Sequence, residues 1–147
     1  MQKAGCELIF FGIESGSDTQ LKQMSKGITT DTIKNAVDIA HQAGIHVRGS
    51  FIIGLDGDTP ETINQTIEFA SGLKRYGLEQ AQFHCLDLYP GTYYWNMVEK
   101  GEGTLKRMYD TYDWSVFSRN KPHIVPNSMT VGELEQLVKY AREQFDK

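Results

Sequence analysis

The sequence predicts an α/β protein in which about three parallel strands alternate with helices, on three observations. Apolar runs at about residues 7–12, 46–53 and 80–86 each end in a polar corner with small residues. A helical stretch follows each corner, and a glycine closes a helical stretch before each strand. Folds that repeat a strand, a loop and a helix bind ligands at the carboxyl ends of their strands. The corners are therefore the first place to look for function.

The first predicted unit begins with a nearly continuous apolar run at about residues 7–12, typical of a strand that is buried on both faces. A short helix is predicted over about residues 18–24. The next helix begins near Thr29 or Thr30, whose hydroxyl groups can accept hydrogen bonds from free backbone N–H groups, and it ends at Gly44.

The second unit has a strand at about residues 46–53 and a strong helix start after it. Thr59 is the predicted N-cap, and Pro60 occupies the first helical position. This helix ends at Gly77. Right-handed crossovers are expected between the parallel strands.

The third unit has a strand at about residues 80–86, a turn at residues 89–92 and a helix over about residues 93–99. Residues 101–128, with Trp114, other aromatic residues and two prolines, are expected to form an irregular covering segment. A capping box made by Thr130 and Glu133 predicts a last helix. Its apolar face contains Leu134, Leu137 and Val138.

Three parallel strands are too few to close a barrel, and parallel strands need neighbours and covered faces. We therefore expect a fragment of a larger fold that begins just before a strand. Residues 1–100 are expected to form half of a barrel, and residues 101–147 a covering segment with a helix. An open sheet edge would also allow edge-to-edge pairing of two copies.

Composition excludes some classes of partner. The net charge of −4 and the pI of about 5.5 argue against a nucleic-acid surface. No apolar run approaches the roughly 20 residues that a membrane-spanning helix needs. Cys6 and Cys85 fit a reducing cytoplasm, and neither belongs to a metal-binding cysteine cluster.

Polar residues recur on one face of two predicted strands. Arg48 and Ser50 share one face of the second strand, and Gln80, Gln82 and His84 share one face of the third. Unpaired burial would cost about 1–3 kcal/mol for each group. These faces therefore either lie at an exposed surface or line a cavity for a polar ligand.

The corner after the first strand contains Glu14 and Ser15. A carboxylate beside a hydroxyl suits a ligand diol, although a local capping role would also explain both residues. The corner at residues 54–59 lacks the phosphate-binding and dinucleotide-binding spacings, and Asp56 and Asp58 would repel phosphate. His84 is the one histidine with a candidate functional role, and the alternative is a structural one.

The segments AGCELIFFGIESGSD, SKGIT, AGIHVRGSFIIGLDGDTPETI and LYPGT together resemble the radical S-adenosylmethionine superfamily. The resemblance covers about residues 1–95 and implies the C-terminal half of a partial, TIM-like (β/α)6 barrel. The chain looks most similar to members with a cobalamin-binding domain, such as anaerobic magnesium-protoporphyrin IX monomethyl ester oxidative cyclases.

The resemblance implies roles for particular residues. Glu14 and Ser15 would lie beside the ribose of S-adenosylmethionine, the strand ending at Gly54 would contact adenine through its backbone, and Arg48 would approach the methionine carboxylate. Asp56 and Asp58 replace the usual proline and glutamate of the following loop, which leaves the rigidity of that loop open. The candidate cofactor-binding residues are Glu14, Ser15, Arg48, Ser50, Ile52, Gly54 and His84.

The three-cysteine loop that holds the superfamily's four-iron four-sulfur cluster is absent from the sequence. The chain alone is therefore expected to be inactive, with the cluster ligands in a missing N-terminal half of an enzyme that acts on a small molecule. One alternative is a non-catalytic nucleoside- or polyol-binding module. Another is half of an unrelated barrel enzyme in which Glu14, Asp56 and Asp58 serve as acid, base or metal ligands.

Overall fold

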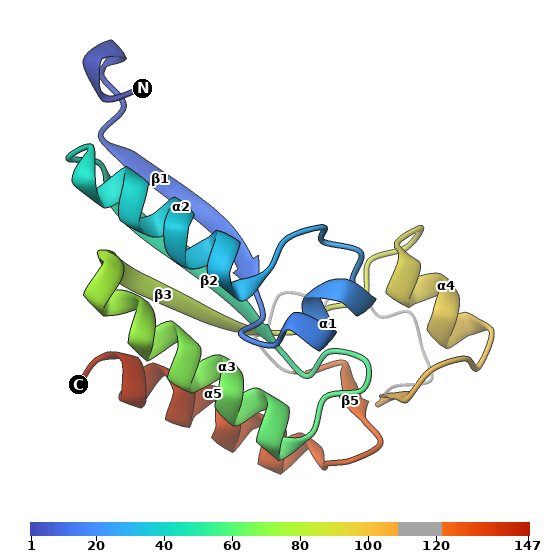
Figure 1. Ribbon diagram of the computed structural model, residues 1–147. Helices are drawn as coiled ribbons and strands as arrows, with labels where there is room; N and C mark the ends of the chain where they lie inside the picture. The colour runs from blue at the N-terminus through green and yellow to red at the C-terminus, as the bar shows by residue number, and fades with distance from the viewer. Residues whose placement is uncertain (109–121) are drawn as a thin grey trace.

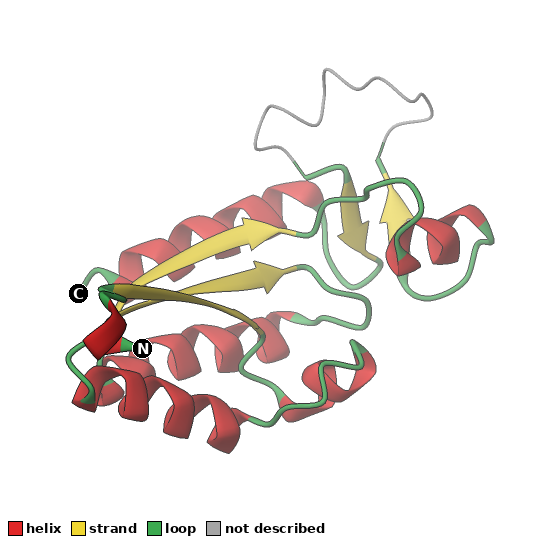
Figure 2. Ribbon diagram, turned by 90° about the horizontal axis from the view of Figure 1, so that it is seen from above, coloured by secondary structure: helices red, strands yellow, loops and turns green. Residues whose placement is uncertain are grey.

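The computed structural model describes residues 1–108 and 122–147, and its centre is a parallel sheet of three strands (Figure 1). The strands are β1 (Leu8–Glu14), β2 (His46–Ile53) and β3 (Leu78–Cys85), in the order β1-β2-β3. The predicted α/β class and the parallel strands are confirmed. The carboxyl ends of all three strands point the same way (Figure 2).

The helices also begin where the sequence predicts. Thr29, Thr59 and Thr130 each accept a hydrogen bond from the backbone N–H three residues later. The capping box of Thr130 and Glu133 is present. The helices are α1 (Asp18–Gln23), α2 (Thr30–Gln42), α3 (Pro60–Gly72), α4 (Tyr93–Glu99) and α5 (Val131–Phe145), with short 3-10 turns η1 (Gln2–Ala4) and η2 (Leu73–Tyr76).

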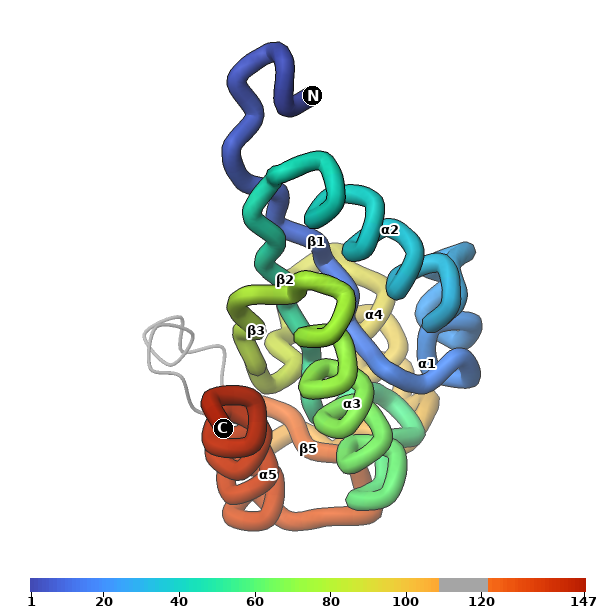
Figure 3. Tube along the Cα trace, turned by 60° about the vertical axis from the view of Figure 1, so that its left-hand side comes forward, coloured from blue at the N-terminus to red at the C-terminus, as the bar shows by residue number. Residues whose placement is uncertain are grey.

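One face of the sheet carries the main hydrophobic core. Val47, Phe51 and Phe83 point to this face and are fully or almost fully buried. Helices α2, α3 and α5 form an arc beside the strands (Figure 3), and their apolar residues belong to the same core. Leu134 and Val138 of α5 are buried there and Leu137 packs against it, as the sequence predicts.

The opposite face of the sheet is open within residues 1–108 and 122–147. Gln80, Gln82 and His84 of β3 are exposed on it, and Phe10 of β1 keeps 48% of its surface exposed. Residues that are neighbours across the strands form rows on this face. One row is Phe10, Arg48 and Gln80, and the next is Gly12, Ser50 and Gln82.

A second, smaller core lies beyond the carboxyl ends of the strands. It is built from loops, α4 and a two-stranded antiparallel sheet, β4 (Leu105–Arg107) with β5 (Ile124–Pro126). The sequence predicts an irregular segment here, and three-residue strands are too short to show the alternation that would reveal them. Trp114 lies outside the described residues. The buried residues of this core are Leu55, Leu86, Leu88, Met97, Leu105 and Ile124.

The described residues include no helix that is both long enough and apolar enough to span a membrane.

Candidate functional site

Glu14 lies at the end of β1, where the strand changes register between Gly12 and Glu14. Its backbone has a φ of 70°, and its carboxylate folds back over Gly12. A Cβ atom at Gly12 would lie only 2.7 Å from Glu14 Oε1, so the missing side chain provides the space for the carboxylate. The backbone of Glu14 pairs with Phe51, but its carboxylate lies over Gly12, which is in the row of Ser50 on the open face of the sheet.

Lys26 holds this carboxylate in place. Its Nζ atom lies 3.1 Å from Glu14 Oε1 and donates a hydrogen bond to it. A hydrogen bond between ionised groups is stronger than a neutral one. The loop after α1 brings the lysine back through left-handed backbone at Ser25 and Gly27. Sequence reasoning did not include Lys26 among the candidate site residues, although it lies in the Lys-Gly pair of the SKGIT segment.

Ser15 points away from the Glu14 carboxylate. Its side chain is buried, with Oγ 3.2 Å from Oγ1 of Thr66 on α3, and it accepts a hydrogen bond from the Ser17 N–H. The neighbouring Gly16 N–H donates to Thr66 Oγ1 as well. The Ser15 hydroxyl therefore anchors the corner to α3, and the open face carries only one of the two residues predicted to lie beside a ribose.

Arg48, Ser50 and Ile52 of β2 alternate with fully buried residues and are half-buried on the open face. Ser50 lies opposite Gly12, beside the Glu14 carboxylate. Ile52 also packs against the second core. In the described part of the chain the Arg48 guanidinium has no hydrogen-bonded or ionic partner, so a cation on this face remains available to an anion.

Gly54 closes β2 in a left-handed conformation with a φ of 88°. Asp58 fixes this turn, because its Oδ2 accepts hydrogen bonds from the N–H groups of Gly54 and Leu55 at 3.0 and 2.8 Å. Its Oδ1 accepts from Gln20 Nε2 and Thr62 Oγ1. Burial raises the pKa of the Asp58 carboxyl, and these hydrogen bonds oppose the rise. These four hydrogen bonds to Asp58 therefore hold the loop in place.

The Asp56 carboxylate accepts hydrogen bonds from a second set of donors. Its Oδ1 accepts hydrogen bonds from the N–H and hydroxyl of Thr104, and its Oδ2 accepts from Gln23 Nε2. No group of three or more His, Cys, Asp or Glu side chains that could hold a metal ion occurs in the described ranges. The alternative in which Glu14, Asp56 and Asp58 form a metal or acid–base centre therefore gains no support from this geometry.

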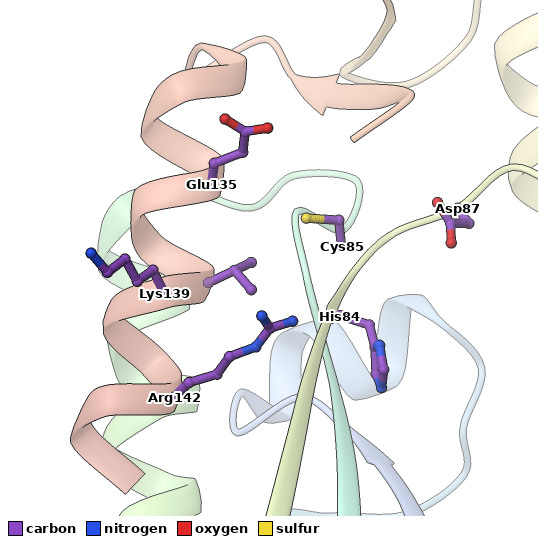
Figure 4. Close-up of a pocket in the computed structure, with 7 residues that line it drawn as sticks. His84, Cys85, Asp87, Glu135, Lys139 and Arg142 are labelled. Carbon is purple, nitrogen blue, oxygen red and sulfur yellow. The ribbon is translucent and has the colours of Figure 1, made fainter. Parts of the chain in front are cut away.

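His84 lies on the open face at the end of β3, and its Nε2 is 3.3 Å from Gln82 Oε1. Beyond the same strand end, a cavity of about 260 Å³ opens between β3 and α5 (Figure 4). Cys85 points towards α5 and His84 away from it. Burial raises the pKa of the Cys85 thiol to about 11, so it is protonated at neutral pH. The other polar residues around the cavity are Asp87, Glu135, Lys139 and Arg142.

The structure thus gathers most of the predicted cofactor-binding residues on one sheet face. Arg48 and Ser50 lie in neighbouring rows on β2, the Glu14 carboxylate lies over Gly12 in the row of Ser50, and His84 lies across the face on β3. Such an arrangement can offer a carboxylate to hydroxyl groups and a guanidinium to an anion. Ser15 does not join this group by its side chain, and Lys26 is added to it.

Comparison with known proteins gives a consistent result. The sequence profile of the Radical SAM superfamily matches residues 1–70. An uncharacterized methyltransferase of Pyrococcus horikoshii is 33% identical over 145 residues, which is 99% of this chain and 30% of that protein.

Two similar proteins have more specific names. The anaerobic magnesium-protoporphyrin IX monomethyl ester cyclase of Cereibacter sphaeroides is 27% identical over 90% of this chain and 20% of its own length. The bacteriochlorophyllide d C-12(1)-methyltransferase of Chlorobaculum tepidum is 28% identical over 97% of this chain and 30% of its own length. The chain thus spans less than a third of each of these relatives.

Proposed function

This chain belongs to the radical SAM superfamily, and we propose that its open sheet face supplies the ribose and adenine side of an S-adenosylmethionine site in a longer radical enzyme. The superfamily implies two cofactors, S-adenosylmethionine and a four-iron four-sulfur cluster. The side chains available on this face suit the first of them.

The position of Glu14 is the observation that carries this proposal. A carboxylate can accept hydrogen bonds from both hydroxyl groups of a ribose, and Glu14 has one oxygen bonded to Lys26 with further acceptor capacity remaining. Lys26 forms an ion pair with the carboxylate, which lies over Gly12. Glu14 would therefore need little rearrangement to bind a diol.

The other residues of the face extend the same site. Ser50 lies beside Glu14, and Ile52 offers apolar surface for a purine ring at the end of β2, next to the turn at Gly54. Arg48 lies one row below and has no hydrogen-bonded or ionic partner among the described residues, and we assign it to the methionine carboxylate. His84, on β3, would complete the opposite side of the site.

The iron–sulfur cluster does not fit this chain. Its cysteine ligands must be thiolates close together, whereas Cys6 precedes β1 and Cys85 ends β3 as a protonated thiol. We propose that the cluster is held by the remainder of the full-length protein. When bound there, it supplies the electron that cleaves the cofactor, and this chain by itself is inactive.

We further propose that the reaction is a methyl transfer or an oxidative cyclisation on a small molecule, because the named relatives are methyltransferases and a cyclase. We also propose that the full-length enzyme is cytoplasmic and that it uses cobalamin, on the resemblance of the sequence motifs to members with a cobalamin-binding domain. Its free cysteines fit a reducing compartment.

The test is titration of S-adenosylmethionine into the reconstituted full-length protein and its Glu14→Ala and Glu14→Gln variants. Hydrogen bonds to an ionised group contribute about 1.5–3 kcal/mol, so the Ala variant should bind roughly 10- to 150-fold more weakly. The Glu14→Gln variant keeps one acceptor oxygen and should therefore lose less affinity for S-adenosylmethionine than the Ala variant. Glu79→Gln, at the exposed amino end of the sheet, is the matched control. An unchanged dissociation constant with a lowered melting temperature would show that Glu14 is only structural.

A further inference from the structure

The cavity between β3 and α5 carries opposite charges at its two ends (Figure 4). Glu135 and Asp87 lie around the carboxyl end of β3. Arg142 lies two helical turns further along α5 than Glu135, which is about 10 Å along the helix axis. The cavity volume of about 260 Å³ is close to the lower limit of small-molecule sites, which is about 300 Å³. The cavity therefore has room for a small ligand and a definite polarity.

The wall between the charged ends is mostly apolar. Val138 lies between Glu135 and Arg142 on the same face of α5 and is buried. Cys85 points towards α5 from the strand, and its protonated thiol is only weakly polar. Burial is the main cause of the raised pKa of this thiol; the charge of Asp87 raises it further, that of Arg142 lowers it and that of Glu135 raises it. The three charged groups thus surround one weakly polar centre.

Arg142 is fixed at its end of the cavity and keeps donors for a ligand. Its Nη2 donates a hydrogen bond to the carbonyl of Phe83 at 2.9 Å. A guanidinium has five N–H donors in a planar fork, and no other hydrogen-bonded or ionic partner of Arg142 occurs within residues 1–108 and 122–147. Because this bond already orients the guanidinium, binding a carboxylate there costs less side-chain entropy.

Glu135 is the carboxylate with the most acceptor capacity at the other end. It has no hydrogen-bonded or ionic partner in the described part of the chain. Asp87 Oδ1, by comparison, lies 3.8 Å from His123 Nε2. Lys139 points away from β3 (Figure 4), and its Nζ lies 3.8 Å from Glu143 Oε1. Neither end of the cavity is therefore neutralised by the protein itself.

We propose that this cavity binds a small zwitterion, which carries a protonated amine and a carboxylate at the two ends of a short aliphatic chain. The amine lies at Glu135 and the carboxylate at Arg142, and the aliphatic chain packs against Val138. A ligand with only one of these charges meets repulsion at the end of like charge. The two charges of an α-amino acid share the same carbon atom and cannot reach both ends, whereas several methylene groups between the charges span the distance.

The experiment titrates the isotope-labelled chain with ε-aminocaproate, caproate and hexylamine, and follows the backbone amide signals by NMR spectroscopy. The three probes have the same aliphatic length and differ in the charges they carry. An additional exposed ion pair strengthens binding by up to about fivefold, so we expect ε-aminocaproate to bind about three- to fivefold more tightly than either other probe. The signals of Cys85 and Val138 should shift. Equal affinities for the three probes, or shifts confined to other parts of the chain, would overturn the proposal.

Two variants test the two ends separately. Glu135→Gln should abolish the preference for ε-aminocaproate over caproate, and Arg142→Gln the preference over hexylamine. Arg75→Gln is the matched control, because Arg75 is also exposed and its Nε donates to the backbone carbonyl of Gly72 at 3.0 Å. It should keep both preferences.

A purely structural role for Arg142 gives a different result. Arg142→Gln would then lower the melting temperature and leave the preference for ε-aminocaproate over hexylamine intact, which would overturn the proposal. Binding of these probes requires neither S-adenosylmethionine nor Glu14, so this inference does not rest on the proposed function. Its failure leaves the cofactor site standing, and failure of the Glu14 test leaves the zwitterion site standing.

Discussion

The two faces of the sheet use neighbouring residues of the same strands for different purposes. On β2, Val47, Phe51 and Ile53 are fully buried beneath the helices, whereas Arg48 and Ser50 between them are half-buried on the open face. Parallel strands are usually apolar on both faces because both faces are covered. The strict alternation here separates a buried face, which stabilises the fold, from a polar face, to which we assign the ligand.

Phe51→Ala should give the largest effect on stability. Phe51 is fully buried, and its ring stacks on Phe83 with the ring centroids 5.2 Å apart. Removing the ring should lower the free energy of unfolding by about 3–5 kcal/mol. Ser50→Ala, one residue earlier on the open face, should change it by less than about 0.5 kcal/mol. Urea denaturation of both variants checks this comparison. Similar losses in the free energy of unfolding would show that the open face contributes as much to stability as the buried face.

Asp58→Ala should have the next largest effect, because it leaves the buried N–H groups of Gly54 and Leu55 without their acceptor. We expect a loss of about 1–3 kcal/mol in the free energy of unfolding. Asp58→Asn should lose less, because its amide oxygen can accept these bonds. Gln20 Oε1, which has no hydrogen-bond partner among the residues that the structure describes, could then accept from the new amide nitrogen if the Gln20 amide turned over. Equal losses for the two variants in thermal and urea melts would contradict this account.

Gly12→Ala should separate function from stability most clearly. The new Cβ would meet Glu14 Oε1 at 2.7 Å, so the carboxylate must move away from Lys26. Because this face is open, the free energy of unfolding should fall by less than about 1 kcal/mol. The affinity of the full-length protein for S-adenosylmethionine should nevertheless fall about as much as in Glu14→Gln. Calorimetric titration measures the affinity, and a parallel thermal melt measures the stability. Unchanged affinity for S-adenosylmethionine would show that Glu14 does not bind the cofactor.

The smallest expected effect is a dependence of stability on pH. Burial raises the pKa of Asp58 in the folded chain, so the folded state keeps a proton there that the unfolded state has already released. Between the ordinary carboxyl pKa and the raised one, the free energy of unfolding should therefore fall as pH rises, and level off above that range. Asp58→Asn cannot titrate and should lack this component. Urea melts of both proteins from acidic to neutral pH measure the difference, and parallel curves would rule out a contribution from Asp58.

Local patterns predicted the sheet and the helices well, because apolar runs and threonine caps report directly on backbone structure. The strand at residues 46–53 and the helix at residues 93–99 have the predicted bounds. The side-chain arrangement at the end of β1 was harder to predict. The register shift before Glu14 leaves the Glu14 carboxylate on the open face and the Ser15 side chain against α3, and alternation alone does not indicate such a shift.

Lys26 illustrates a second limit. It lies 12 residues from Glu14 in sequence, and only the left-handed turn at Ser25 and Gly27 brings the two side chains together. Sequence reasoning recovered the open-face residues of β2, whose positions follow from strand geometry. It missed a contact that depends on the path of a loop, for which no periodic signal exists.

The protonated state of Cys85 has a practical consequence for labelling. With a pKa of about 11, only about one molecule in a thousand carries the reactive thiolate at pH 8. Alkylating reagents applied near neutral pH should therefore spare Cys85 and modify Cys6, the other free cysteine. Cys6 lies just before β1, so a single fluorophore or spin label attached there would report directly on whatever binds at that edge of the sheet.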